Sequence, residues 1–190
     1  MIAIPISNSN LARGTNMSNF DELRNIADGF ADQYPEDQAW NGSSFNWMRR
    51  LPPGRKNVVG RSMLASLLNQ NGLTAMLSSN RQLRVNGNGI SVKLAMMWED
   101  GIVKFQNIRG DLDFDFVFCL ALYPHQAFGW VIPKAEIWKD GKFNVANAGI
   151  TDQHDGADAW LDIDPANPAP WLAGYGGTID QAIAIAKKSF

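Results

Sequence analysis

Apolar residues recur at helical spacing in three segments of the chain. The first begins at Ser18, which can cap a helix with an acidic first turn, and its apolar stripe consists of Phe20, Leu23, Ile26, Ala27 and Phe30. The second covers residues 57–70 and ends at Asn71-Gly72, and its inward residues are Val58, Val59, Met63, Leu64 and Leu67. The third covers residues 178–188, with Thr178 as its cap. We therefore predict a helix over each of these three segments.

The period changes to that of strands after residue 72. Residues 73–77, 82–85 and 89–97 are predicted strands, and Asn86-Gly87-Asn88-Gly89 between the last two is a strong hairpin signal. Because successive side chains of a strand alternate between its faces, Ser91 and Lys93 share one face of the returning strand. The apolar neighbours of these two residues then face the opposite side.

The most apolar run of the chain is DFDFVFCLALY at residues 113–123, which predicts a central strand covered on both faces. One face is expected to carry Phe114, Phe116, Phe118 and Leu120, and the other Asp115, Val117, Cys119 and Ala121. A further strand is predicted over 129–133 and a short helix over 134–138. Residues 101–109 resemble a short helix, residues 40–51 indicate short turns, and residues 144–172 are expected to be mostly loop.

Together these elements predict an α/β fold with a mixed central sheet flanked by helices. Residues 1–17, rich in Asn and Ser, are expected to form a flexible N-terminal arm, and residues 18–190 a single domain. With one cysteine, Cys119, the chain has no internal disulfide, and its two histidines exclude a histidine-rich metal site. No stretch approaches the ~20 apolar residues of a membrane span, and the start lacks the layout of a signal peptide. A cytoplasmic protein without membrane contact is expected.

Charge is distributed unevenly along the chain. Residues 1–37 contain two basic and six acidic residues, and residues 99–190 contain seven and thirteen. Residues 38–98 contain no Asp or Glu, and their eight cations are Arg49, Arg50, Arg55, Lys56, Arg61, Arg81, Arg84 and Lys93. Such a basic window is typical of a surface that binds phosphate backbones, and the alternative is a basic face balanced by acidic neighbours in the fold. Arg61, expected near the start of the second helix, is unfavourably placed in the helix dipole, which also favours a partner anion.

Several motifs occur in a recognisable order. They are W-x-G-S-x-F-x-W at 40–47, V-V-G-R-S-M-L-A at 58–65, I-S-V-K-L-A at 90–95, W-E-D-G-I-V-K-F-Q-N-I-R at 98–109, D-F-D-F-V-F-C-L-A-L at 113–122, W-V-I-P-K at 130–134, Q-H at 153–154 and P-x-P-W-L-A-G-Y-G-G-T at 168–178. The ordered set resembles restriction-endonuclease-like proteins of the PD-(D/E)XK nuclease superfamily. The resemblance covers about residues 40–188 and implies a mixed sheet with a Mg²⁺-binding cluster of acids beside the scissile phosphate.

This chain departs from that pattern at each acid. Ser91 stands at the Glu of the Glu-x-Lys motif, Gln82 near the expected Asp, and Arg61 at the expected helical Glu, so that Lys93 alone is retained. The resemblance therefore implies a DNA-binding protein with a degenerate metal site, no cofactor, and double-stranded DNA as its partner. It would act as a non-cutting partner of an active nuclease subunit or as a regulator. Its expected DNA-binding residues are Arg49, Arg50, Arg55, Lys56, Arg84, Lys104, Arg109 and His154.

Two alternatives stay open. One is an active endonuclease that binds Mg²⁺ through relocated acids, for which the candidates are Glu99, Asp100, Asp111 and Asp113. The other is a protein-interaction module whose basic face docks an acidic partner. Among the remaining features, Asp111, Asp113 and Asp115 alternate at a strand entrance, where they would bind a cation or form a solvated lip. Trp40, Trp47 and Trp98 would either stack on bases or fill the core.

Overall fold

The computed structural model describes residues 19–31, 37–78, 82–98, 100–139, 142–146 and 158–190. The chain divides into two compact units, residues 1–37 and 38–190, and each is described by itself. The first unit contains helix α1 (Asn19–Ala31), as the sequence predicts. The side chains of Phe20, Leu23 and Ile26 from its apolar stripe are exposed.

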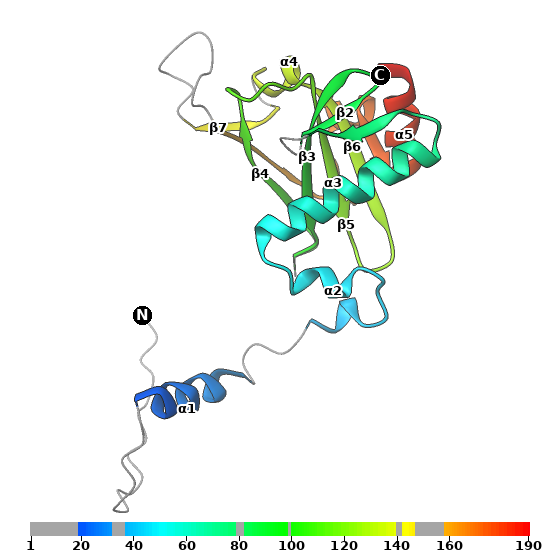
Figure 1. The fold of residues 1–190 in the computed structure, drawn as a ribbon. Coiled ribbons are helices and arrows are strands. Elements are labelled where there is room, and N and C mark those ends of the chain that lie inside the picture. Colours follow the sequence, from blue (N-terminus) through cyan, green and yellow to red (C-terminus); the bar gives the residue numbers. More distant parts are fainter. Residues whose placement is uncertain (1–18, 32–36, 79–81, 99, 140–141, 147–157) are drawn as a thin grey trace, which may run out of the picture. The chain divides into compact units, whose positions relative to one another are not determined.

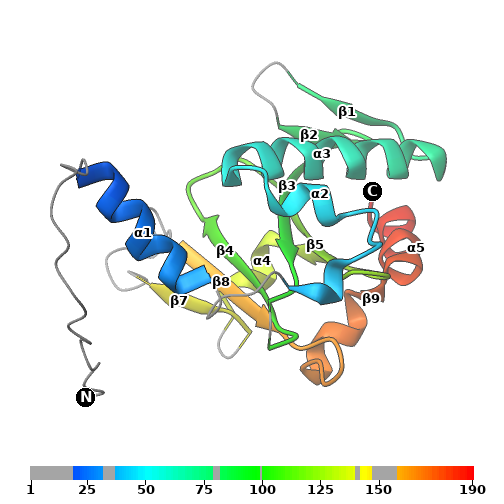
Figure 2. The same ribbon diagram turned by 90° about the horizontal axis from the view of Figure 1, so that it is seen from below.

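The second unit is built around a six-stranded sheet with the order β1-β2-β3-β5-β6-β9 (Figures 1 and 2). Its strands are β1 (Ala75–Leu77), β2 (Leu83–Val85), β3 (Asn88–Met96), β5 (Phe116–Leu122), β6 (Ala127–Pro133) and β9 (Gly176–Thr178). The central pair β3 and β5 is parallel, while the other neighbours are antiparallel. The hairpin between β2 and β3 turns at Asn86-Gly87, both with positive φ, as its sequence predicts.

Two helices cover one face of this sheet, α3 (Pro53–Gln70) and α5 (Ile179–Ser189) (Figure 1). The core beneath them joins Leu64 and Leu68 of α3 and Ile183 of α5 to Phe118 and Leu120 of β5. Helix α5 begins with a capping box, in which the Thr178 side chain accepts from the Gln181 N–H and the Gln181 side chain accepts from the Thr178 N–H. The shorter helices are η1 (Gln38–Trp40), α2 (Asn46–Arg49), α4 (Lys134–Ile137) and η2 (Pro170–Gly174).

A second sheet covers the other face. It has the order β4-β8-β7, from β4 (Val103–Arg109), β8 (Asp158–Ile163) and β7 (Asn144–Ala146). Phe105 and Leu161 of this sheet pack with Val117, Cys119 and Trp130 of the large sheet in a second core. The predicted α/β class, a mixed sheet flanked by helices, is confirmed. Within the described residues, every helix is too short or too polar to serve as a membrane-spanning segment.

The helix predicted over residues 101–109 is wrong, because this segment is strand β4. Its buried residues are Val103, Phe105 and Ile108, and the pairing with β8 shifts register between the last two. Asn107 sits in that irregularity with a φ of 56°. The extra residue changes the apolar spacing from two to three, which imitates a helix in the sequence.

The loop predicted over residues 144–172 is also incomplete, because β7 and β8 lie within it. In β8, Ala159, Leu161 and Ile163 are buried at a period of two, a signal hidden by the Asp-rich composition around it. Strand β9 was missed as well. A Cβ at Gly176 would collide with the carbonyl of Gly129, so glycine here permits a close strand approach rather than forming a loop.

Smaller corrections concern the ends and faces of elements. Helix α3 begins at Pro53 rather than at residue 57, because proline suits the first helical position. Arg61 therefore lies in the middle of the helix, and Val58 is exposed. Strand β5 begins at Phe116, so Phe114, before the strand, packs in the core under the small sheet instead of with Phe118.

Candidate functional site

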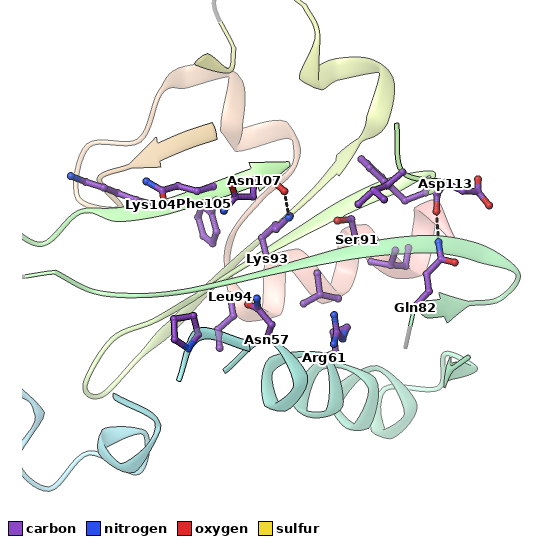
Figure 3. Close-up of a pocket in the computed structure, with 16 residues that line it drawn as sticks. Asn57, Arg61, Gln82, Ser91, Lys93, Leu94, Lys104, Phe105, Asn107 and Asp113 are labelled. Carbon is purple, nitrogen blue, oxygen red and sulfur yellow. Dashed lines mark hydrogen bonds between the residues drawn. The ribbon is translucent and has the colours of Figure 1, made fainter. Parts of the chain in front are cut away.

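A pocket of about 560 Å³ opens along strand β3 (Figure 3). Its polar lining is supplied by α3, β3, β4 and the segments before β2 and β5, and consists of Asn57, Arg61, Gln82, Ser91, Lys93, Lys104, Gln106, Asn107 and Asp113. The four positions that the sequence singles out, 61, 82, 91 and 93, all line this pocket. Residues up to 32 positions apart in the chain are thus brought to one place.

The pocket exists because β2 is much shorter than β3. Pairing of β3 with β2 ends at Ile90, while pairing with β5 continues to Met96. Among the described strands, none pairs with the remaining edge of β3. Ser91 and Lys93 point to one side of β3, and Asn57 and Arg61 approach from α3 on the other side (Figure 3).

Lys93 lies at the centre of the pocket and is half-buried. Its ammonium donates a hydrogen bond to the backbone carbonyl of Asn107, a residue that lies in the irregularity of β4. Burial lowers the pKa of Lys93, and the positive charges of Arg109 and Arg61 act in the same direction, whereas Cys119 and Asp158 act against it. The side chain is therefore a cation whose charge is incompletely solvated.

Gln82 and Asp113 form one end of the pocket (Figure 3). The side-chain amide of Gln82 donates to the backbone carbonyl of Asp113. The Asp113 carboxylate is 95% exposed and lies 3.8 Å from the guanidinium of Arg84. Of the described residues that line the pocket, Asp113 supplies the one carboxylate, against the cations Arg61, Lys93 and Lys104.

Of the relocated acids that an active nuclease would use, Asp100, Asp111 and Asp113 are among the described residues. Asp111 pairs with Arg109, and the Asp100 carboxylate accepts from the N–H of Ile102. Asp115 accepts from the N–H of Gly89. The three carboxylates predicted to alternate at a strand entrance therefore each have a different partner. Glu99 lies outside the described residues. Within the described part of the chain, no group of three or more His, Cys, Asp and Glu side chains is arranged to hold a metal ion.

The residues predicted to bind DNA fall into three groups. Lys104 lines the pocket. Arg84 lies beside the pocket, because its guanidinium is 3.8 Å from the carboxylate of the lining residue Asp113. Arg55 and Lys56 lie in the first turn of α3, after Pro53, which lines the pocket. Arg109 is engaged by Asp111, Arg49 lies over the buried Trp40 at 5.5 Å from its ring centroid, and Arg50 is exposed beside it. His154 lies outside the described residues.

The sequence analysis missed three polar residues of the pocket, Asn57, Gln106 and Asn107. Asn57 precedes Arg61 by four positions on α3 and therefore shares its face, a signal that the sequence contained. Asn107 contributes a backbone carbonyl rather than a side chain, and its role depends on the register shift in β4. Residue identity gave no signal for it.

Neither the family models nor the curated proteins compared with this chain gave a match. The chemistry of the pocket therefore rests on its own lining. Among the described residues, three cations and several amide and hydroxyl groups line this space, together with one exposed carboxylate. Charge-assisted hydrogen bonds of this kind suit an oxyanion such as a phosphate group.

Proposed function

We propose that residues 38–190 bind DNA, with a backbone phosphate held in the pocket along β3. The observation that carries the proposal is the lining itself, in which Arg61, Lys93 and Lys104 face a space to which the described residues contribute a single carboxylate. A phosphate compensates the half-buried Lys93 ammonium, whose hydration is reduced by the surrounding protein.

The first turn of α3 adds to the attraction for an anion. It contains Arg55 and Lys56 and no acidic residue, and Pro52 before it provides no side-chain cap. Cations at a helix N-terminus oppose the helix dipole, so both features raise the local positive potential. Pro53 and Asn57 of the same helix line the pocket, so this potential acts beside it.

The pocket also supports a relationship to restriction-endonuclease-like scaffolds. Gln82, Ser91, Lys93 and Arg61 stand at the positions where the resemblance expects an active site, and they line one pocket in the structure. We infer that the scaffold retains the place of the phosphate and has replaced the acids that hold metal. The protein then acts as a non-cutting partner of a nuclease subunit or as a regulator.

The test is a salt-dependent binding titration with a labelled duplex of about 25 base pairs, in which each phosphate contact contributes about −0.9 to the slope of log affinity against log salt. Arg61→Ala combined with Lys93→Ala is expected to flatten the slope by about 2 and to weaken binding at least tenfold at low salt. Lys187→Ala, in the last turn of α5 and outside the pocket lining, is the matched control and is expected to change the slope little.

If the unmodified protein shows no binding at low salt, the proposal is wrong and the basic surface serves a protein partner. The active-nuclease alternative is tested separately. Incubation with plasmid DNA and Mg²⁺ or Mn²⁺ is expected to leave the plasmid supercoiled, and nicking that is lost on Asp113→Asn would establish metal-dependent cleavage instead.

A further inference from the structure

Trp98 is an exposed aromatic residue on a well-anchored turn. Its side chain is 62% exposed. Its backbone N–H donates to the Ile102 carbonyl at 3.2 Å, and its carbonyl accepts from the Gly101 N–H at 2.9 Å. The buried Tyr123 fixes the same turn by donating its hydroxyl to the Gly101 carbonyl at 2.6 Å. These hydrogen bonds hold the described residues Trp98, Gly101 and Ile102, and the indole is exposed to solvent.

Lys104 connects this indole to the pocket. Its ammonium lies over the Trp98 ring, 5.8 Å from the centroid, and the same residue lines the pocket. In Figure 3, Lys104 lies at the end of the pocket opposite Gln82 and Asp113. The nearest described carboxylate in the turn, that of Asp100, accepts from the Ile102 N–H at 3.0 Å. An aromatic face thus adjoins the cationic end of the proposed phosphate site.

We propose that Trp98 is a stacking platform for one unpaired nucleobase, and that the DNA bound here carries a locally unpaired nucleotide. This inference rests on the proposed function of the pocket. Inside a duplex both faces of a base are covered by its neighbours, so an indole can stack only on a base that has left the helix or lies at a frayed end. Stacking on an aromatic side chain is tolerant of sequence, because every base has a π-face.

The experiment compares three labelled DNAs of equal length: a fully paired duplex, a duplex with a three-nucleotide bubble, and the same bubble with abasic sites at its unpaired positions. The unmodified protein is expected to bind the bubble roughly tenfold more tightly than the other two, as one stacked base contributes. Trp98→Ala is expected to remove this preference, and Trp98→Phe to retain most of it. Trp47→Ala is the matched control, since Trp47 is similarly exposed at 55% on α2, whereas it is Trp98 whose ring lies under the pocket residue Lys104.

The outcomes separate this inference from the proposed function. Equal affinity for all three DNAs, with binding still dependent on Arg61 and Lys93, would overturn the stacking platform and leave the phosphate site standing. A bubble preference that persists in Trp98→Ala, or that persists with abasic sites, would overturn it as well. No binding to any of the three would overturn the proposed function itself.

Discussion

Strands β3 and β5 are parallel neighbours, in register over seven pairs from Ile90↔Phe116 to Met96↔Leu122, yet they differ sharply in character. Strand β5 is apolar throughout and buried from Val117 to Leu122. Strand β3 alternates and carries Ser91 and Lys93 on the face that opens to the pocket. The cause is their neighbours, because β5 is paired on both edges along its length, whereas β3 is paired on both edges only at Ile90, where its pairing with β2 ends and its pairing with β5 begins. The polar side chains that line the pocket thus lie on the strand whose edge is open, directly beside the buried strand.

The same contrast appears in one registered pair, Lys93 and Cys119. Both lie on the same side of the sheet. Burial raises the pKa of the Cys119 thiol to about 12 and lowers that of the Lys93 amine, so both groups are pushed toward their neutral forms. One is enclosed in the core, and the other borders the pocket.

The largest expected effect comes from creating a cavity in β5. Phe118 is fully buried under α3 and α5, so Phe118→Ala is expected to lower the free energy of unfolding by roughly 3–5 kcal/mol. Urea denaturation measures this loss. Met76→Ala, on the exposed side of β1, is the control and is expected to change stability by less than about 0.5 kcal/mol. A similar small loss for Phe118→Ala would show that β5 is not the stabilising strand of the pair.

A smaller effect follows from making β3 resemble β5. The folded pKa of Lys93 is lowered, so between that value and the unfolded pKa near 10.4 the unfolded state binds more protons, and stability rises with pH. Lys93→Met is expected to be more stable than the unmodified protein at pH 7, with an advantage that shrinks as pH approaches 10. Urea titrations at both pH values measure this difference.

Ser91→Ala is the control for the Lys93 experiment, because it alters the same face of β3 without changing a titrating group. It is expected to leave the pH dependence of stability unchanged. An advantage of Lys93→Met that is constant from pH 7 to pH 10 would mean that burial of the ammonium does not cost stability.

The smallest expected effect is that the thiol of Cys119 does not react in the folded protein. The Cys119 thiol is fully buried and its pKa is raised to about 12, so a thiol reagent at pH 8 is expected not to modify the folded protein. One equivalent is expected to react after unfolding in urea. Rapid modification without urea would place Cys119 on an accessible edge and remove the contrast between the two strands.

Local signals in the sequence predict those elements whose buried residues recur at a regular spacing. The β2–β3 hairpin, the apolar run of β5 and the capped helix α5 are of this kind, since turn chemistry and capping act between near neighbours. Strands β4 and β8 escaped because each pairs with a partner that is distant in the chain, and the irregularity at Asn107 hides the period of β4. Strand β9 depends on a close approach between Gly176 and Gly129, which are distant in the chain.

In the candidate site, too, some residues could be predicted from the sequence and others could not. Arg61, Gln82, Ser91 and Lys93 were identified from spacing and resemblance, and they line one pocket. The partners that define their environment were not identified, because the Asn107 carbonyl and the pairing of Arg84 with Asp113 arise only when separate elements meet. Residue type predicts which side chains carry charge, whereas tertiary contacts decide which of those charges are already satisfied.

The shortness of β2 has a consequence for how this architecture can change. Three paired residues hold β2 to β3, from Leu83↔Ile90 to Val85↔Asn88, and the hairpin ends where the pocket begins. Each residue by which β2 were extended before Leu83 would lengthen the ladder along β3, which already continues to Met96, and would replace open edge with backbone pairing. The width of the opening is therefore encoded in the length of a hairpin rather than in the identity of the side chains around it. A lineage that lengthens or shortens this hairpin changes what the pocket admits without altering a single cationic residue.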